Sequence, residues 1–429
     1  MHLKTRLRST LMRYLSSAGV QARQQSRARR KRGSEAVVHY FHQVDDPYSH
    51  LAVQKLDALA EGYRLRFKPH LVSKPDAEHQ GSAEHFDFWA LEDARQVAGS
   101  YGVSFAPEVT RVSSEAIQAA NDALAPETSG NAFAATAFEV GEALWRGETP
   151  AGSADSLQAV QEGDALRRKL GHYQGAMFYF EGEWYWGLDR MRLLEERLIS
   201  EGFANGTTPL VPEPTPQDTR GLNAENVVLE YFPSLRSPYT AIGHARVLAL
   251  IERSGVSVRL RPVMPMMMRG VPAPRAKQRY IIADAAREGR AHGAPFGRIV
   301  DPFGPPVERA FALFPGAVKL GLGMAFVTAY LEAAWFEGID ITTERGLQQV
   351  VSNSGTDWIS MTNAAEGENW RGLLDENLAA LFEGNLWGVP SFRVTGGSID
   401  TPYACWGQDR IWRVEDEIAR RATQGDQQA

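Results

Sequence analysis

The sequence contains very little cysteine, since Cys405 is the single one among 429 residues. One cysteine excludes an internal disulfide, a C-x-x-C redox pair and a metal site built from several cysteines. It leaves the compartment open but fits a reducing one, and we expect a cytoplasmic protein. We also expect no metal site. Long apolar runs are lacking too: no stretch of about 18 apolar residues is present, and we predict no transmembrane segment. With 43% hydrophobic and 23% charged residues, the composition is that of a globular protein.

Acidic residues are absent from Met1–Ser34, although this segment holds ten lysines and arginines. Its leucines recur every four residues, at Leu3, Leu7, Leu11 and Leu15. A short basic amphipathic helix is one interpretation, and a transit peptide or a tail that touches anionic lipid or nucleic acid is another. A disordered extension over residues 1–35 is our main expectation, because residues 24–32 are too charged to pack. We expect no specific nucleic-acid partner.

A pattern that occurs twice dominates the rest of the chain. Tyr40-Phe41 followed by Asp46-Pro47-Tyr48-Ser49 returns as Tyr231-Phe232 followed by Ser237-Pro238-Tyr239-Thr240, with the same spacing. Further along, the spacing still holds for Trp89, Asp93 and Gly102 against Tyr280, Asp284 and Gly293. A register that survives a whole helix indicates two copies of one fold.

The residue pattern of each copy predicts a strand, a helix, a second strand, a long helical stretch, a tight hairpin and a final helix. The first two strands need a helical crossover and the last two are joined tightly, so the sheet is mixed. We therefore predict an α/β fold with two tandem thioredoxin-like domains, each with an all-helical insertion. The expected boundaries are a basic tail at 1–35, a degenerate domain at 36–205, a proline-rich linker at 206–224, a second domain at 225–421 and a tail at 422–429.

In the second copy, Ser237 precedes a proline where a strand gives way to a helix. Proline in the first helical turn places Ser237 beside unpaired backbone N–H groups, where an anion is favoured. A hydroxyl there can hold a ligand's thiolate ionised, with Arg236 adding positive charge. An ordinary N-cap serine is the alternative.

Two further segments of the second copy have ligand-binding features. Pro390 enters a strand, so a cis bond after Val389 would expose backbone groups that pair with an extended, peptide-like ligand. The alternative is a proline at a strand edge. In Gly407–Arg410, Gln408 and Asp409 at a helix start suit a ligand's ammonium and carboxylate, unless Asp409 is a plain helix-terminal charge.

Taken together and in this order, Ser237-Pro238-Tyr239, Gly388-Val389-Pro390 and Gly407–Arg410 resemble the kappa-class glutathione transferases and 2-hydroxychromene-2-carboxylate isomerases. Those proteins belong to the DsbA-like thioredoxin superfamily, and the likeness covers most of Asn226–Arg421. The resemblance implies that Ser237 contacts the glutathione sulfur, with Tyr239 and Arg236 in support. It also implies that Val389 with Pro390 pairs with the cysteinyl backbone, and that Gln408 and Asp409 hold the γ-glutamyl end. Gln408 departs from the Ser or Asn that is common at its position.

The first copy lacks these residues. Asp46 stands at the serine position, and we align Gly175-Ala176-Met177 with Gly-Val-Pro. A carboxylate beside a thiolate would raise the pKa of that thiol, so the first copy should not activate glutathione. Since family members commonly form dimers, we expect an intramolecular pseudo-dimer and a monomeric chain.

The main hypothesis is a glutathione-dependent isomerase or transferase that acts on a small aromatic-derived substrate by reversible addition of the thiolate. A catalytically silent thioredoxin-like binding or scaffold protein is the alternative. Thiol–disulfide exchange of the DsbA kind is disfavoured, because neither strand-to-helix junction has a cysteine.

Overall fold

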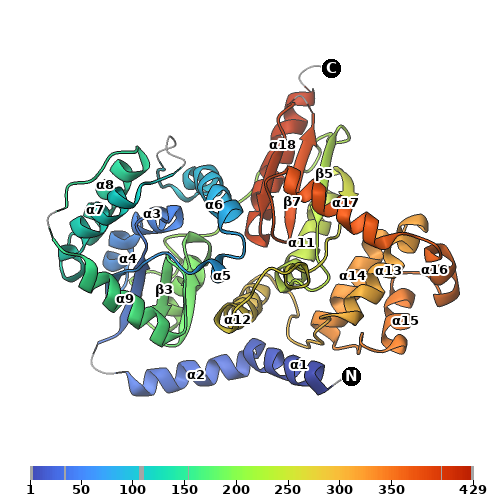
Figure 1. Cartoon of the computed structure of the whole chain (residues 1–429), viewed down its shortest axis with the longest axis horizontal. Coiled ribbons are helices and arrows are strands. Elements are labelled where there is room, and N and C mark those ends of the chain that lie inside the picture. Colours follow the sequence, from blue (N-terminus) through green and yellow to red (C-terminus); the bar gives the residue numbers. More distant parts are fainter. Residues whose placement is uncertain (1–2, 33–34, 106–110, 153, 398, 427–429) are drawn as a thin grey trace. The chain divides into compact units, whose positions relative to one another are not determined.

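The computed structural model describes residues 3–32, 35–105, 111–152, 154–397 and 399–426. The chain divides into two compact units (Figure 1). The C-terminal unit comprises Met1–Gln21, Thr215–Pro272 and Ile281–Ala429. The N-terminal unit comprises Ala22–Pro214 and Ala273–Tyr280.

The N-terminal unit contains a four-stranded sheet of order β2-β1-β3-β4. β1 (Val37–His42) runs parallel to β2 (Arg66–Leu71) and antiparallel to β3 (Met177–Phe180), which forms a hairpin with β4 (Glu183–Trp186). Its helices are α3 (Pro47–Val53), α4 (Leu56–Gly62), α5 (Ala77–Gln80), α6 (Ala83–Ala98), α7 (Ser114–Leu124), α8 (Phe133–Trp145), α9 (Leu157–Leu170) and α10 (Met191–Ser200).

The C-terminal unit contains a second four-stranded sheet, of order β6-β5-β7-β8. β5 (Val227–Phe232) is parallel to β6 (Ser257–Leu260) and antiparallel to β7 (Ser391–Gly396), which pairs with β8 (Tyr403–Trp406). Its helices are α11 (Pro238–Ser254), most of α12 (Arg275–Ala291), α13 (Pro305–Lys319), α14 (Gly323–Leu331), α15 (Glu344–Asn353), α16 (Trp358–Ala365), α17 (Trp370–Glu383) and α18 (Ile411–Asp426).

Both sheets are mixed and follow the predicted order of elements, which confirms that part of the expectation. The same internal hydrogen bonds also recur in the two units. Tyr48 Oη donates to Asp93 at 2.7 Å, and Tyr239 Oη donates to Asp284 at 2.8 Å. In each unit, a tyrosine of the helix that follows the first strand (α3 or α11) is hydrogen-bonded to the first long helix of the helical insertion (α6 or α12).

The described residues of the C-terminal unit form two hydrophobic cores. One lies between its sheet and helices α11 and α18, around Leu229, Val394 and Ile418. The other fills the helical insertion, where α13 to α16 group together in Figure 1, and includes Trp335. The indole N–H of Trp335 donates to the carbonyl of Leu235 at 3.2 Å. The insertion therefore holds the loop that leads from β5 into α11.

The basic N-terminal segment is helical: α1 spans Leu3–Ser16 and α2 spans Ala18–Lys31. The expected disordered extension is therefore wrong, and the alternative of a short amphipathic helix is confirmed for α1. The cations at the end of the segment find acidic partners within the N-terminal unit, since Arg32 bonds to Glu181 and to Glu201, the latter at 2.6 Å. These ion pairs hold the end of the basic segment against the N-terminal unit, which the composition alone did not predict.

The expected helix after β1 is broken into α3 and α4, and α18 continues to Asp426, past the predicted domain end at residue 421. Residues 427–429 of the predicted C-terminal tail lie outside the described part of the chain. Among the described residues, no helix combines the length and the apolar character needed to cross a membrane.

Candidate functional site

Ser237 lies at the end of the loop between β5 and α11, with its side chain 7% exposed. It has extended backbone angles and caps α11, because its Oγ accepts a hydrogen bond from the N–H of Thr240 at 3.1 Å. The N-cap interpretation is thereby confirmed. The same hydroxyl lies 3.4 Å from the carbonyl oxygen of Val389, which it reaches as a donor. A bond of this length is weak, so the proton is available to another acceptor.

The loop before Ser237 is held by several independent contacts. The N–H of Ser234 donates to Thr240 Oγ1 at 3.3 Å, and the N–H of Val263 donates to the carbonyl of Pro233 at 3.0 Å. Together with the Trp335 bond to Leu235, these contacts fix the position of the serine.

The peptide bond between Val389 and Pro390 is cis, as the sequence suggested. Val389 is 8% exposed, and its backbone N–H has no hydrogen-bond partner within the described parts of the chain. The preceding Gly388 has no space for a side chain, because a Cβ there would lie 2.2 Å from the Trp406 ring. The carbonyl of Pro390 accepts from the N–H of Gly407 at 2.9 Å, which joins this loop to the turn before α18.

That turn contains Gln408 and Asp409, whose side chains differ in solvent exposure. Gln408 is 1% exposed, and its amide donates to Glu288 at 3.0 Å and accepts from Arg246. The Gln408 side chain is thus used inside the protein. Asp409 is half-buried, and its carboxylate accepts a hydrogen bond from Gln408.

The two supporting residues are held by internal contacts. The Nε of Arg236 donates to the buried Asp301 at 2.9 Å, so its positive charge is compensated. Tyr239 donates to Asp284, as described above, and Asp284 also pairs with Arg287 at 2.9 Å. Both residues therefore stabilise the frame around Ser237.

Arg269, which the sequence reasoning did not single out, lies beside the cis-proline loop. Its Nε donates to the carbonyl of Met264, and one terminal nitrogen donates to the carbonyl of Trp387, each at 3.0 Å. Burial lowers the pKa of this guanidinium to about 10. The signal in the sequence was a basic residue directly after the methionine-rich stretch Met264–Met268.

The corresponding place in the N-terminal unit is closed by internal hydrogen bonds. Asp46 caps α3 and accepts from the N–H and the hydroxyl of Ser49, at 3.1 and 2.8 Å. The N–H of Ala176 donates to Ser49 Oγ at 2.9 Å. Burial raises the pKa of Asp46 to about 7, although the hydrogen bonds from Ser49 and Tyr48 lower it.

The strand registers correct our alignment of this loop by one residue. Met177 pairs with Phe41, and Ser391 pairs with Phe232 at the equivalent place in the other sheet. Ala176 is therefore the counterpart of Pro390, and Gly175 that of Val389. A Cβ at Gly175 would lie 2.7 Å from the Cβ of Gln43, so this position has no space for a valine.

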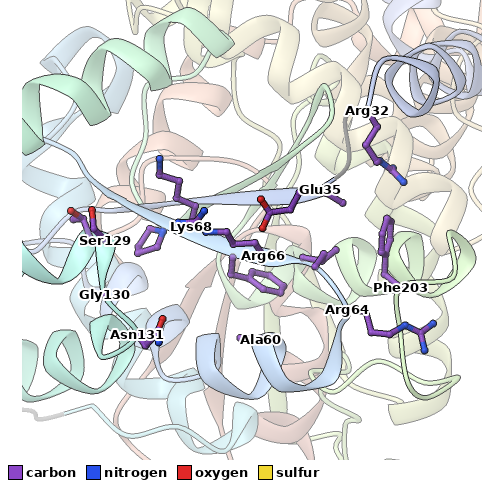
Figure 2. A pocket seen from close by; sticks show the side chains of 15 residues that line it. Arg32, Glu35, Ala60, Arg64, Arg66, Lys68, Ser129, Gly130, Asn131 and Phe203 are labelled. Carbon is purple, nitrogen blue, oxygen red and sulfur yellow. The ribbon is translucent and has the colours of Figure 1, made fainter.

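An open pocket of about 620 Å³ lies in the N-terminal unit, and none of the predicted site residues lines it. It follows the edge strand β2, with Ser129, Gly130 and Asn131 at one end and Arg64 and Phe203 at the other (Figure 2). Across the described residues, no group of three or more histidine, cysteine or acidic side chains is arranged to hold a metal ion.

Residues 228–419 match the family model of the DSBA-like thioredoxin domain. The C-terminal unit thus contains a domain of this class. No curated protein matches the sequence.

Two solved structures are among those similar to this chain. One is a 2-hydroxychromene-2-carboxylate isomerase, with 20% identity over 47% of this chain and 99% of its own, and a TM-score of 0.38. The other is the cytosolic disulfide reductase DsbM from Pseudomonas aeruginosa, with 17% identity over 47% of this chain and 100% of its own, and a TM-score of 0.35.

Proposed function

We propose that the C-terminal unit is a glutathione-dependent isomerase or transferase of the 2-hydroxychromene-2-carboxylate isomerase type, which acts on a small aromatic-derived substrate. We also propose that the two units are tandem thioredoxin-like domains, of which the N-terminal one is inactive. The observation that carries this proposal is the Ser237 hydroxyl at the start of α11, 3.4 Å from the carbonyl of the residue before Pro390.

The residues around Ser237 fit a peptide-like thiol in part. The hydroxyl of Ser237 and the N–H of Val389 are donors for the sulfur and the backbone of such a ligand, and Asp409 is an acceptor for its ammonium group. Gln408 does not fit the role that the resemblance implies, because Glu288 and Arg246 already occupy its amide. Bound glutathione would supply the thiol nucleophile.

Ser237 would favour the ionised form of that thiol. Its proton makes only a weak bond to the Val389 carbonyl and can be donated to a thiolate instead. The N-terminus of α11, a helix of 17 residues, adds positive potential at the same place. Arg236 contributes less to this potential, because its guanidinium is paired with Asp301.

Disulfide exchange finds no support in these residues. Cys405 lies within β8, is 1% exposed and forms no disulfide. Because Ser237 stands at the junction where a DsbA-like enzyme would need its reactive cysteine, the C-terminal unit has no dithiol chemistry of its own.

A catalytically silent binding protein is the second candidate, and the buried Gln408 favours it. An amide that is already paired weakens one of the expected contacts to the γ-glutamyl end. The cytoplasmic location, the pseudo-dimer and the monomeric state remain predictions.

Calorimetric titration of reduced glutathione tests the proposal. We expect one site per chain, with a proton released to the buffer because the thiol binds as a thiolate. Ser237→Ala should abolish that proton release with a modest loss of affinity, whereas Asp409→Ala should lose affinity and keep the release. Asp46→Ala is the matched control at the other junction and should change neither quantity.

The outcomes separate the two candidates. Binding with proton release, followed by thiol-dependent turnover of an aromatic substrate that Ser237→Ala abolishes, supports the enzyme. Binding that is the same in wild type and Ser237→Ala supports the silent protein. No binding at millimolar glutathione overturns both versions of a glutathione site.

A further inference from the structure

The first helix, α1, lies on the C-terminal unit through its more polar side. Ser9 and Ser16 are each 4% exposed, and Ser9 Oγ accepts from the N–H of Asp301 at 3.1 Å. The Nε of Arg13 donates to the carbonyl of Ile299 at 2.9 Å, and Met12 and Leu15 pack against the core of the helical insertion. These contacts fix which side of α1 faces the protein.

The opposite side of α1 presents large apolar side chains to solvent. Leu3, Leu7, Leu11 and Tyr14 are 72%, 63%, 50% and 54% exposed. At 3.6 residues per turn they form one stripe, half a turn away from the side that carries Ser9 and Ser16. An amphipathic helix on a globular protein normally turns its apolar side inward, whereas α1 leaves four large apolar side chains exposed on its outer side.

The apolar stripe, defined as Leu3, Leu7, Leu11 and Tyr14, is bordered by positive charge. Lys4 lies on one side of the stripe and Arg6 on the other, and both are exposed. No acidic residue occurs in Met1–Ser34 to compensate them. Arg8, in contrast, is directed to the protein, 3.8 Å from Asp301 and over the Phe303 ring.

We propose that α1 binds the surface of a membrane that contains anionic lipid. The apolar stripe would insert among the lipid chains near the headgroups, while Lys4 and Arg6 pair with anionic headgroups at its borders. The combination of an apolar stripe with flanking cations favours lipid over nucleic acid, which offers charge but no apolar medium. A helix of 14 residues lies along such a surface and is too short to span it. This inference does not depend on the glutathione site.

Sedimentation of the full chain with vesicles tests the inference. The probes are phosphatidylcholine vesicles with and without about one third of phosphatidylserine. We expect binding to the anionic vesicles that is at least tenfold tighter than to the neutral ones and that weakens as salt is raised. Lys4→Gln with Arg6→Gln should reduce affinity for the anionic vesicles about tenfold.

The decisive variant is Leu7→Ser with Leu11→Ser, which should lose at least tenfold in affinity. Its matched control is Leu157→Ser with Ile359→Ser, since these leucine and isoleucine side chains are 59% and 69% exposed on other helices. The control should bind as the wild type does. Because all four side chains are exposed, both variants should keep the thermal unfolding midpoint of the wild type.

Four results would each overturn the proposal. The first is the absence of binding to anionic vesicles, and the second is equal binding by the Leu7→Ser, Leu11→Ser variant. The third is a wild-type dimer in light scattering that the same variant dissociates, since the stripe would then be covered by a second copy of the chain. Binding to nucleic acid in place of vesicles, unchanged by the leucine substitutions, counts against it as well.

Discussion

The strand-to-helix junctions after β1 and after β5 have the same backbone turn but different side chains. In both, the residue before a proline caps the next helix, Asp46 for α3 and Ser237 for α11. In both, the hydroxyl three residues after the cap accepts a hydrogen bond from a backbone N–H of the preceding loop. The N–H of Gln43 donates to Ser49 Oγ at 3.2 Å, and the N–H of Ser234 donates to Thr240 Oγ1 at 3.3 Å. The turn therefore does not depend on which cap residue is present.

The difference lies in the strand that faces the cap. The N–H of Ala176 closes the N-terminal junction by donating to Ser49. Pro390, at the same place in the other sheet, has no N–H to donate, and the Ser237 hydroxyl reaches the Val389 carbonyl instead. The first junction satisfies its own polar groups, whereas the second leaves the Ser237 hydroxyl in a weak hydrogen bond and the Val389 N–H without a partner among the described residues. A turn that both units share thus says little about the chemistry of the site until the facing strand is known.

The largest expected effect concerns Asp46. Its pKa of about 7, raised by burial, exceeds the value of about 3.9 in an unfolded chain, so the folded state keeps a proton that the unfolded state has lost. The free energy of unfolding should therefore fall as pH rises from about 4 to 7, by up to about 4 kcal/mol from this group. Asp46→Asn keeps a cap acceptor and removes the titration. We expect the variant to be the more stable protein above pH 7, as measured by urea unfolding.

The matched control for that change is Ser237→Asn, which alters the other cap without removing a titrating group. Its unfolding free energy should differ from that of the wild type by the same amount at pH 4 and pH 8. A pH dependence of Asp46→Asn that equals that of the wild type would show that Asp46 is not protonated in the folded state.

The second effect compares the two sheets. Glu230 on β5 is 2% exposed, and Arg261 donates to it at 2.7 Å. Burial opposes its ionisation, but hydrogen bonds from Arg393 and Arg261 outweigh burial and lower the pKa. Glu230→Gln would leave these cations without their acid, at a cost of about 3 kcal/mol. The cost should shrink as pH falls below about 4, where an unfolded glutamate is protonated.

His39 is the residue of β1 that corresponds to Glu230, so it supplies the control. Burial lowers the pKa of His39, which is therefore neutral at pH 7, and its Nδ1 lies 2.9 Å from His70 Nε2. His39→Gln removes no charge and should cost under about 1 kcal/mol. Equal costs at the two positions would contradict the view that the buried acid makes β5 differ from β1.

Much of the fold was predictable from the sequence, because the two copies repeat their turn residues and their apolar periods. Pro47 and Pro238 begin their helices as expected, and the strands of both sheets have the predicted order. In the N-terminal tail, the leucine spacing allowed one short amphipathic helix, which α1 bears out, but α2 was not predictable from composition. Its order depends on acids far along the chain, such as Glu181 and Glu201 for Arg32.

The candidate site was predictable in its outline and not in its details. The residues at Ser237 and at the cis bond before Pro390 follow from local turn chemistry. The pairing of Gln408 with Arg246 and Glu288 could not be foreseen, because these three residues come from distant elements. The one-residue error at Ala176 has a similar origin, since a register is set by the partner strand.

The third effect tests whether the shared tyrosine anchors are equivalent. Tyr48→Phe removes a hydrogen bond to Asp93, and Tyr239→Phe removes one to Asp284. A hydrogen bond to a charged acceptor contributes about 2 kcal/mol, so both variants should lose a similar amount of unfolding free energy. Thermal unfolding of the two variants beside the wild type measures this. A loss confined to one variant would mean that the two anchors are not equivalent.

The smallest expected effect transfers the N-terminal cap into the C-terminal unit. Ser237→Asp preserves the cap of α11, because aspartate accepts from helix N–H groups as well as serine does. The new carboxylate would stand where a thiolate is expected, and repulsion between the two negative charges raises the pKa of the thiol. If Ser237 contacts the sulfur, affinity for glutathione should fall at least tenfold at pH 8, with less loss at pH 5, where both groups are more protonated. Calorimetry at the two pH values measures this difference. Unchanged affinity at pH 8 would mean that the sulfur does not bind at the start of α11, and the difference between the two caps would then have no bearing on thiol chemistry.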